Sequence, residues 1–198
     1  MTIPHKQRII SAASGVEPAV EKIGACNTLV RRGDKWFGYN TDWLGFLSPL
    51  DSAVMGSGAV PGDEGFRGGE GFRGGRALVA GAGGAARAVV YALVSRNFEV
   101  VIVNRTAARA EALAAEFGCR GYGYEAAEAE GVFRQSYRIA VQTTSVGMEP
   151  DDGRSPLPGF DFSNVEIAYD LIYAPPKTVF LREAEKAGCT IINGLPML

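Results

Sequence analysis

The glycine-dense turn after residue 80 is the part of this sequence whose residue types most clearly suit a ligand. A short apolar run, 77–80, leads into the turn, and an alanine-rich run of helical character leaves it. Gly81 and Gly83 allow a sharp turn and a close backbone approach, and the free N–H groups and positive dipole end of the helix face the same point. We therefore predict an anion site, most simply for a dinucleotide pyrophosphate; on the motif alone, a turn without a ligand is the alternative. The predicted contacts are Gly81, Ala82, Gly83, Gly84 and Ala85.

The end of the next apolar run indicates which dinucleotide is bound. In a βαβ unit of this kind, an Asp or Glu some 20 residues after the glycine turn accepts from the ribose 2′-hydroxyl of NAD. Here the run 98–103 is followed by Asn104, Arg105 and Thr106, with Arg109 one helical turn further on. An arginine beside amide and hydroxyl donors suits a 2′-phosphate, so the sequence predicts NADP. The alternative is that both arginines are solvated charges at the start of a helix.

The elements that must position these motifs alternate between strand and helix patterns. This alternation predicts an α/β fold whose Rossmann-type, doubly wound parallel sheet has helices on both faces. The expected strands are 77–81, 98–103, 138–142, 165–172 and 189–193, and the expected helices are 84–95, 107–117 and 177–187. The region 118–137 is less regular. The run 142–148, rich in small polar residues, leaves a strand at its carboxyl end, where open α/β sheets bind ligands.

The first 55 residues have a different pattern. The expected elements are short helices at 7–13 and 16–23, a hairpin of strands 26–30 and 36–39, and a longer helix from 41 onward. Gly24 ends the second helix, and Thr41 or Asp42 caps the longer one. We interpret residues 1–55 as a partial α/β domain that precedes the sheet domain 77–198.

A glycine-rich stretch, 56–76, joins these two parts. It contains the hexapeptide 64–69 and an immediate repeat of it at 70–75. Such a segment has too little apolar surface to offset its ordering entropy, so we predict a flexible surface loop. The Phe-Arg pairs of the repeat leave a nucleic-acid-binding arm as the alternative. The repeat has only two copies and contains two acidic residues, and both features argue against such an arm.

The overall composition narrows the class of protein. With 20 Lys and Arg against 22 Asp and Glu, the net charge of −2 provides no basic surface for nucleic acid or an anionic membrane, and no apolar run is long enough to span a bilayer. The N-terminus is too polar for a signal peptide, so we expect a cytoplasmic protein. Three dispersed cysteines indicate a reducing compartment. The single histidine, His5, and the absence of paired cysteines argue against a metal site.

Eight short segments occur along the chain in a characteristic order. They are Thr2-Ile3-Pro4-His5-Lys6, Ile23-Gly24-Ala25-Cys26-Asn27-Thr28, Asn40-Thr41-Asp42, the run 81–88, Asn104-Arg105-Thr106, Thr144-Ser145-Val146-Gly147-Met148, Asp170-Leu171-Ile172-Tyr173 and Asn193-Gly194-Leu195-Pro196-Met197-Leu198. In sequence and order they resemble the shikimate dehydrogenase family, including the form fused behind a dehydroquinate dehydratase domain. The resemblance implies NADP-dependent, reversible reduction of 3-dehydroshikimate to shikimate in aromatic amino-acid biosynthesis, with a small-molecule substrate and NADP as cofactor.

The resemblance also implies roles for individual residues. Lys6 and Asp42 match the family's catalytic pair. The matched substrate contacts are Thr2, Asn27, Asp42 and Tyr173, and the matched cofactor contacts are the glycine turn, Asn104, Arg105, Thr106, Arg109, Leu171 and Gly194. Chemistry agrees, because reduction of a ring ketone requires a proton donor and an ammonium held near a carboxylate can serve as one. Without the resemblance, Lys6 would be a solvated charge and Asp42 a helix cap.

The chain also departs from the family pattern. The family has a longer stretch before the first motif and a final helix after the last, so the resemblance implies a chain truncated at both ends. These missing segments belong to the substrate-binding part of the family, so we expect this chain to bind the cofactor even if it does not turn over substrate by itself. Two alternatives stay open, an NAD-preferring quinate or shikimate dehydrogenase and a non-catalytic metabolite-binding regulator with the same fold.

Overall fold

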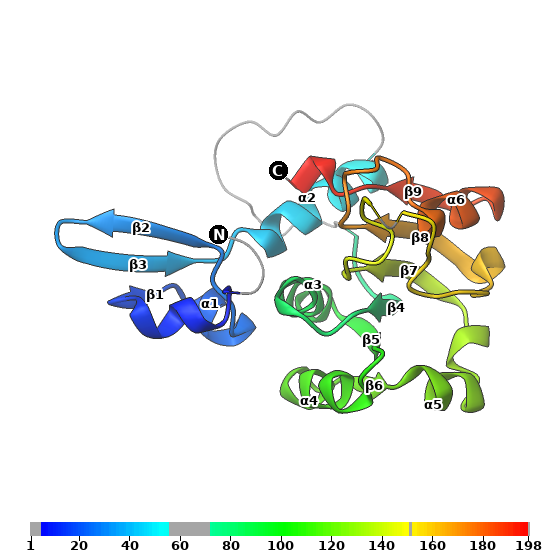
Figure 1. The fold of residues 1–198 in the computed structure, drawn as a ribbon, viewed down its shortest axis with the longest axis horizontal. Coiled ribbons are helices and arrows are strands. Elements are labelled where there is room, and N and C mark those ends of the chain that lie inside the picture. The colour runs from blue at the N-terminus through cyan, green and yellow to red at the C-terminus, as the bar shows by residue number, and fades with distance from the viewer. Residues whose placement is uncertain (1–4, 56–71, 151, 198) are drawn as a thin grey trace.

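The computed structural model of the chain describes residues 5–55, 72–150 and 152–197. Thr2 and most of the predicted glycine-rich loop lie outside these residues. Figure 1 shows a small sheet at one end of the molecule, a larger sheet with helices at the other, and α2 running between them.

The N-terminal unit is a three-stranded sheet with short helices. Its elements are η1 (Arg8–Ala12), β1 (Gly15–Val16), α1 (Pro18–Ile23), β2 (Thr28–Arg32), β3 (Lys35–Tyr39) and α2 (Asp42–Met55), with strand order β1-β3-β2. The antiparallel β2–β3 pair confirms the predicted hairpin. The helix predicted from residue 16 begins instead at Pro18, because Gly15 and Val16 pair in parallel with β3. Residues 8–12 form a 3₁₀ helix within the range predicted as helical.

The larger unit is a six-stranded parallel sheet. Its elements are β4 (Gly75–Ala80), α3 (Gly84–Ser95), β5 (Phe98–Val103), α4 (Ala107–Phe117), β6 (Arg120–Tyr122), α5 (Tyr124–Ala129), η2 (Val132–Arg134), β7 (Tyr137–Gln142), η3 (Phe162–Asn164), β8 (Val165–Asp170), α6 (Val179–Lys186), β9 (Thr190–Ile192) and η4 (Leu195–Met197). The strand order β6-β5-β4-β7-β8-β9 is that of a Rossmann fold, which confirms the predicted fold class. The order reverses between β4 and β7, where such folds bind ligands.

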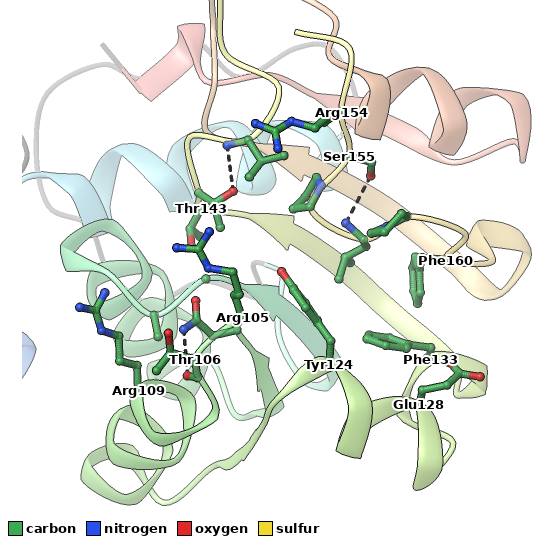
Figure 2. Close-up of a pocket in the computed structure, with 18 of the residues that line it drawn as sticks. Arg105, Thr106, Arg109, Tyr124, Glu128, Phe133, Thr143, Arg154, Ser155 and Phe160 are labelled. Carbon is green, nitrogen blue, oxygen red and sulfur yellow. Dashed lines mark hydrogen bonds between the residues drawn. The ribbon is translucent and has the colours of Figure 1, made fainter. Parts of the chain in front are cut away.

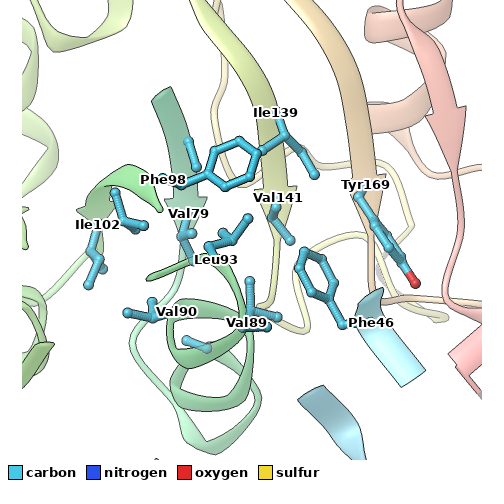
Figure 3. Close-up of a cluster of buried hydrophobic side chains, with 14 of the residues drawn as sticks. Phe46, Val79, Val89, Val90, Leu93, Phe98, Ile102, Ile139, Val141 and Tyr169 are labelled. Carbon is cyan, nitrogen blue, oxygen red and sulfur yellow. The ribbon is translucent and has the colours of Figure 1, made fainter. Parts of the chain in front are cut away.

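The sheet is buried on both faces, so its strands are almost continuously apolar. Val79 and Ile139 face one core with α2, α3 and α4, and Leu78 and Ala140 face the other with α5 and α6. Figure 3 shows the first core, in which Phe46 of α2 reaches the sheet beside Tyr169. Their rings stack with centroids 4.9 Å apart. Helix α2 therefore belongs to the N-terminal unit by sequence and to the sheet's core by packing.

The sequence pattern missed β6 and α5, both in the region described as less regular. Strand β6 is three residues long and has a glycine in the middle, which breaks the apolar pattern of a strand. A Cβ on Gly121 would lie 2.3 Å from the carbonyl oxygen of Ala110 in α4. Only glycine allows this close packing of α4 against the strand. The fold therefore requires the same glycine that breaks the apolar pattern of β6.

The prediction of a flexible loop over 56–76 is wrong for its last residues. Phe72 is buried against Phe98, with ring centroids 5.0 Å apart, and the Arg138 guanidinium lies 4.5 Å above its ring centre. The Phe72 amide donates to Asp51, which also pairs with Arg96 at 2.7 Å. Strand β4 then begins at Gly75. The second hexapeptide ends in the core because its phenylalanine finds apolar partners that composition alone does not show.

Candidate functional site

A cleft of about 1140 Å³ opens at the carboxyl ends of β4, β5 and β7. Figure 2 shows side chains from α4, α5 and the loops after β7 converging on it. Its lining residues are Gly81, Ala82, Gly83, Asn104, Arg105, Thr106, Arg109, Tyr124, Glu125, Glu128, Ala129, Phe133, 143–146 and 154–160. The cleft lies at the point where the strand order reverses, as the fold class requires for a ligand site.

The glycine turn forms the floor of this cleft. Gly81 has φ +116°, and a Cβ on it would lie 2.4 Å from the Thr143 hydroxyl. A Cβ on Gly83 would meet no described atom within 4 Å, so open space lies above the turn. No described side chain caps α3 at Gly83, which leaves the first N–H groups of the helix for a ligand. The turn therefore has the geometry that a diphosphate needs.

Basic and polar residues at the end of β5 form one side of the cleft. The Asn104 side chain donates to the Thr106 carbonyl oxygen at 3.0 Å and shapes this turn. Arg105 and Arg109 are exposed, and neither forms an ion pair with any residue that the structure describes. Two guanidinium groups in this position suit a phosphate dianion on the adenosine ribose.

A buried glutamine shapes the loop that follows β7. The Gln142 amide nitrogen donates to the Val146 carbonyl oxygen at 2.7 Å, and its oxygen accepts from the Thr144 amide at 2.8 Å and hydroxyl at 2.9 Å. Thr143 donates to the carbonyl oxygen of Ala80 through both its amide and its hydroxyl. These bonds hold the 143–146 loop against the glycine turn.

A buried aspartate shapes the next loop in the same way. Asp170 accepts from the Ile172 amide at 2.9 Å and from the Thr178 hydroxyl at 2.6 Å. Burial raises the pKa of Asp170 to about 6, and these two hydrogen bonds oppose the rise. The loop brings Leu171 beside Gly194, where a Cβ would lie only 2.0 Å from the Leu171 carbonyl oxygen. Leu171 and Gly194 are thus adjacent, although neither lines the cleft.

The two residues matched to a catalytic pair are in contact although they lie 36 positions apart. Lys6 Nζ lies 2.6 Å from Asp42 Oδ2, and their side chains are only 14% and 21% exposed. The other oxygen, Asp42 Oδ1, accepts from the Asn27 amide nitrogen at 2.7 Å. The three side chains form a chain of donors and acceptors at the start of α2.

Further polar contacts fix this group in place. The Asn27 side chain also donates to the Thr41 hydroxyl and accepts from the Thr41 amide, each at 3.0 Å. Asn40 is 1% exposed; its side chain accepts from the Asp42 amide at 3.0 Å and donates to the Ala25 carbonyl oxygen at 2.8 Å. The side-chain oxygen that binds the first amide of α2 therefore belongs to Asn40, whereas we expected the cap to come from Thr41 or Asp42.

The N-terminal unit contacts the first turns of α3. A Cβ on Gly84 would lie 3.4 Å from the Cβ of Lys6, so the lysine packs directly against the start of the helix. Arg87, one turn further on, donates to the Ile23 carbonyl oxygen, pairs with Glu116 of α4 and holds the pKa of that carboxyl below its ordinary value. Gly24 has φ +67°, and a Cβ there would collide with the Arg87 guanidinium. Lys6 is thereby brought next to the glycine turn.

The structure divides the predicted site residues into two groups. The cleft collects Gly81, Ala82, Gly83, Asn104, Arg105, Thr106 and Arg109, and Lys6, Asp42 and Asn27 lie together beside Gly84. Ala85 follows in the first turn of α3, and Tyr173 is an exposed residue of the loop after β8. We find neither Gly84, Ala85, Leu171, Gly194 nor Tyr173 among the residues that line the cleft.

Sequence reasoning missed the far side of the cleft. Tyr124 and Phe133 come from the region without a clear pattern, and 154–160 is a loop rich in proline and glycine. Burial raises the pKa of Tyr124, and the nearby Arg105 charge opposes the rise. The position of Tyr124 directly after a strand would have marked it, had that strand been recognised. Among the described residues, no group of three or more His, Cys, Asp or Glu could hold a metal ion, and no helix could cross a membrane.

The strand order, with the glycine turn at the point where it reverses, defines a Rossmann-type α/β protein. Its small N-terminal unit packs against α3, the helix that follows the glycine turn. Residues 67–144 match the family described as Shikimate / quinate 5-dehydrogenase. Over its whole length the chain is 41% identical to a shikimate dehydrogenase (NADP(+)) of Brucella abortus and 40% identical to one of Thermus thermophilus. Over its whole length the chain is thus similar to proteins of the shikimate dehydrogenase family.

Solved structures agree with this assignment. The chain superposes with a TM-score of 0.79 and 39% identity on a Thermus thermophilus shikimate 5-dehydrogenase in complex with NADP(H) and shikimate, covering 99% of this chain and 66% of that one. A chorismate mutase/shikimate 5-dehydrogenase fusion protein from Clostridium acetobutylicum gives 0.80 at 28% identity, with 64% of it covered. The chain likewise spans 64% of the Brucella relative, so it corresponds to just under two thirds of the proteins that it matches.

Proposed function

We propose that this protein catalyses the reversible, NADP-dependent reduction of 3-dehydroshikimate to shikimate. The observation that carries the proposal is the Lys6–Asp42 pair, which lies against Gly84 at the start of the helix that follows the dinucleotide turn. A proton donor and a cofactor site so arranged are the two parts that reduction of a ketone requires. The relatives named for this activity support the same assignment.

The cleft would hold the cofactor through residues of known chemistry. Gly81, Gly83 and the first amides of α3 would bind the diphosphate, and Arg105 and Arg109 would bind the 2′-phosphate. Bound there, NADPH supplies a hydride to the carbonyl carbon of the substrate. Open space above Gly83 and guanidinium groups without described acidic partners fit this cofactor.

Lys6 and Asp42 of the N-terminal unit would transfer the proton. As the carbonyl oxygen gains negative charge, the Lys6 ammonium donates a proton to it, so that ketone, hydride and proton together yield the alcohol. Asp42 orients Lys6 through the 2.6 Å contact and balances its charge, while Asn27 holds the second oxygen of Asp42. In the oxidative direction, the neutral amine takes the proton back. The substrate contacts that we propose are Asn27 and Asp42 of the N-terminal unit and Tyr173 of the loop after β8.

The test is a direct assay of the purified protein with 3-dehydroshikimate and NADPH. The expected result is a loss of nicotinamide absorbance that depends on both compounds and is much slower with NADH. The matched variants are Lys6→Ala and Lys22→Ala, because Lys22 is an exposed lysine on α1 away from Asp42. Only the first is expected to lose activity.

The outcomes separate the alternatives. A protein that binds NADPH yet shows no absorbance change with 3-dehydroshikimate would point to a non-catalytic metabolite-binding regulator. Faster turnover with NADH than with NADPH, or with quinate than with shikimate, would instead indicate an NAD-preferring quinate or shikimate dehydrogenase.

A further inference from the structure

The loop between β7 and η3 contributes a third arginine to the cleft. Arg154 is exposed and lines the cleft together with Arg105 and Arg109, but it comes from the opposite side. In Figure 2 its side chain extends from the upper loop toward the side on which Thr143 lies. The motifs at the ends of β4 and β5 do not include it.

Contacts on both sides of Arg154 fix its backbone. Gly147 has φ +92°, and a Cβ on it would lie 3.0 Å from the Arg154 carbonyl oxygen, so the start of the loop packs directly against this residue. After it, Leu157 and Phe160 are buried in the second core, and the Phe160 ring lies edge-on to Phe133 with centroids 6.0 Å apart. Because the loop is held on both sides of Arg154, this residue is kept at the wall of the cleft.

The loop that carries Arg154 is tied to the glycine turn through Thr143. Arg154 is held beside Gly147, in the same loop as Thr143, and the Thr143 hydroxyl lies within contact distance of Gly81. Arg105 and Arg109 follow β5, on the other side of that turn. Arg154 and the pair Arg105 and Arg109 thus reach the cleft from different elements.

We propose that Arg154 is a cofactor-binding residue that contacts the diphosphate of the dinucleotide from the solvent side, opposite the N-terminus of α3. This proposal rests on the proposed function, since it assigns one more contact within the same cofactor site. A guanidinium group suits the role because it donates two parallel hydrogen bonds to a phosphate. With Arg154 on one side and the α3 amides on the other, the diphosphate is held from both sides.

The test measures binding of two nucleotide fragments by calorimetry, without turnover. ADP-ribose carries the diphosphate and no 2′-phosphate, whereas adenosine 2′,5′-bisphosphate carries the 2′-phosphate and, on the 5′ oxygen, only one of the two phosphates of the diphosphate. For Arg154→Gln we expect the dissociation constant of ADP-ribose to rise about tenfold, the effect of one lost charge-assisted hydrogen bond. Binding of adenosine 2′,5′-bisphosphate is expected to stay within about threefold of wild type.

Two variants provide the comparison. Arg105→Gln is expected to show the opposite pattern, with the larger loss for adenosine 2′,5′-bisphosphate. Arg120→Gln removes an exposed arginine at the start of β6, where it pairs with Glu99 at 3.7 Å, and is expected to change neither constant. Melting temperatures of the variants equal to wild type show that each has folded.

Each outcome decides something. Unchanged ADP-ribose binding in Arg154→Gln overturns the proposal, and so does a larger loss for adenosine 2′,5′-bisphosphate than for ADP-ribose. Selective loss of ADP-ribose supports it, even if the protein fails to reduce 3-dehydroshikimate, so the two proposals can fail separately. A wild-type protein that binds neither fragment overturns both.

Discussion

Different interactions stabilise the parallel-sheet unit and the N-terminal unit of this protein. In the six-stranded sheet, strands such as β4 and β7 are buried on both faces, and the cleft lies at the edge of this apolar framework. In the N-terminal sheet, most residues of β2 and β3 are exposed or half-buried. The group around Asp42 is instead held by side-chain hydrogen bonds and by contact with α3.

This difference suggests that the two units contribute different steps of the proposed reaction. In the function that we propose, nucleotide binding would use main-chain amides and arginines of the parallel-sheet unit, and no described side chain of the N-terminal unit lines the cleft. The proposed proton transfer would use Lys6 and Asp42, which a polar network and the contact of Lys6 with α3 bring together. Substitutions in the two units are therefore expected to separate binding from turnover.

The largest expected effect comes from the candidate proton donor. Replacing Lys6 by Ala is expected to lower kcat by roughly 10² to 10⁴, the loss typical of a missing general acid, with the dissociation constant of NADPH changed less than about twofold. Stopped-flow turnover and fluorescence titration measure the two quantities. Equal losses in both would break the comparison, because the N-terminal unit would then be part of the cofactor site.

The next effect concerns pH and lies in the parallel sheet. Because the pKa of Asp170 is raised from 3.8 to about 6 by burial, the folded state keeps a proton that the unfolded state has lost. The resulting stabilisation is complete below about pH 4, falls between pH 4 and 6, and amounts to roughly 3 kcal/mol in total. Urea unfolding of wild type and Asp170→Asn at several pH values tests this. The difference between their unfolding free energies is expected to change by about that amount; a constant difference would contradict it.

A smaller effect is expected from Arg105, which we propose binds the 2′-phosphate of the cofactor. Replacing Arg105 by Ala is expected to weaken NADPH binding by roughly 10- to 100-fold and NADH binding by less than about threefold, because only NADPH carries the additional phosphate. Parallel titrations with both nucleotides provide the measurement. If the two affinities fell together, Arg105 would have a structural role.

The smallest effect is expected in the core of the sheet. The Tyr169 hydroxyl is buried and has no hydrogen-bond partner among the described residues, and burial raises its pKa. Tyr169→Phe removes this group and keeps the ring stacked on Phe46, so the free energy of unfolding should stay within about 0.5 kcal/mol of wild type or rise slightly. A loss of more than about 2 kcal/mol in chemical denaturation would mean that the hydroxyl is bonded after all.

The sequence predicted the parallel sheet best where local pattern and burial agree. The bounds of α3, β5 and α4 are those expected from the sequence, because strands buried on both faces and alanine-rich helices leave strong periodic signals. Strand β1 was missed because its two residues are extended only through pairing with β3. Strand β6 was missed because packing against α4 requires a glycine in it.

The candidate site was predictable only in part. The glycine turn and Arg105 follow from strand-end chemistry, and both lie in the cleft. No local pattern indicated that Lys6 would meet Asp42; only the resemblance to a family did. Arg154 had no signal at all, because its place in the cleft depends on where Gly147 and Leu157 anchor a loop of irregular sequence.

The contact between Gly24 and Arg87 has a consequence for the spacing of the two units. At residue 24 even one methyl group would press on the guanidinium that joins α1 to α3 and α4. Because residue 24 has only a hydrogen atom in place of a side chain, the Arg87 guanidinium has room to contact α1 and α4 at once, and a larger residue would compete with it for that space.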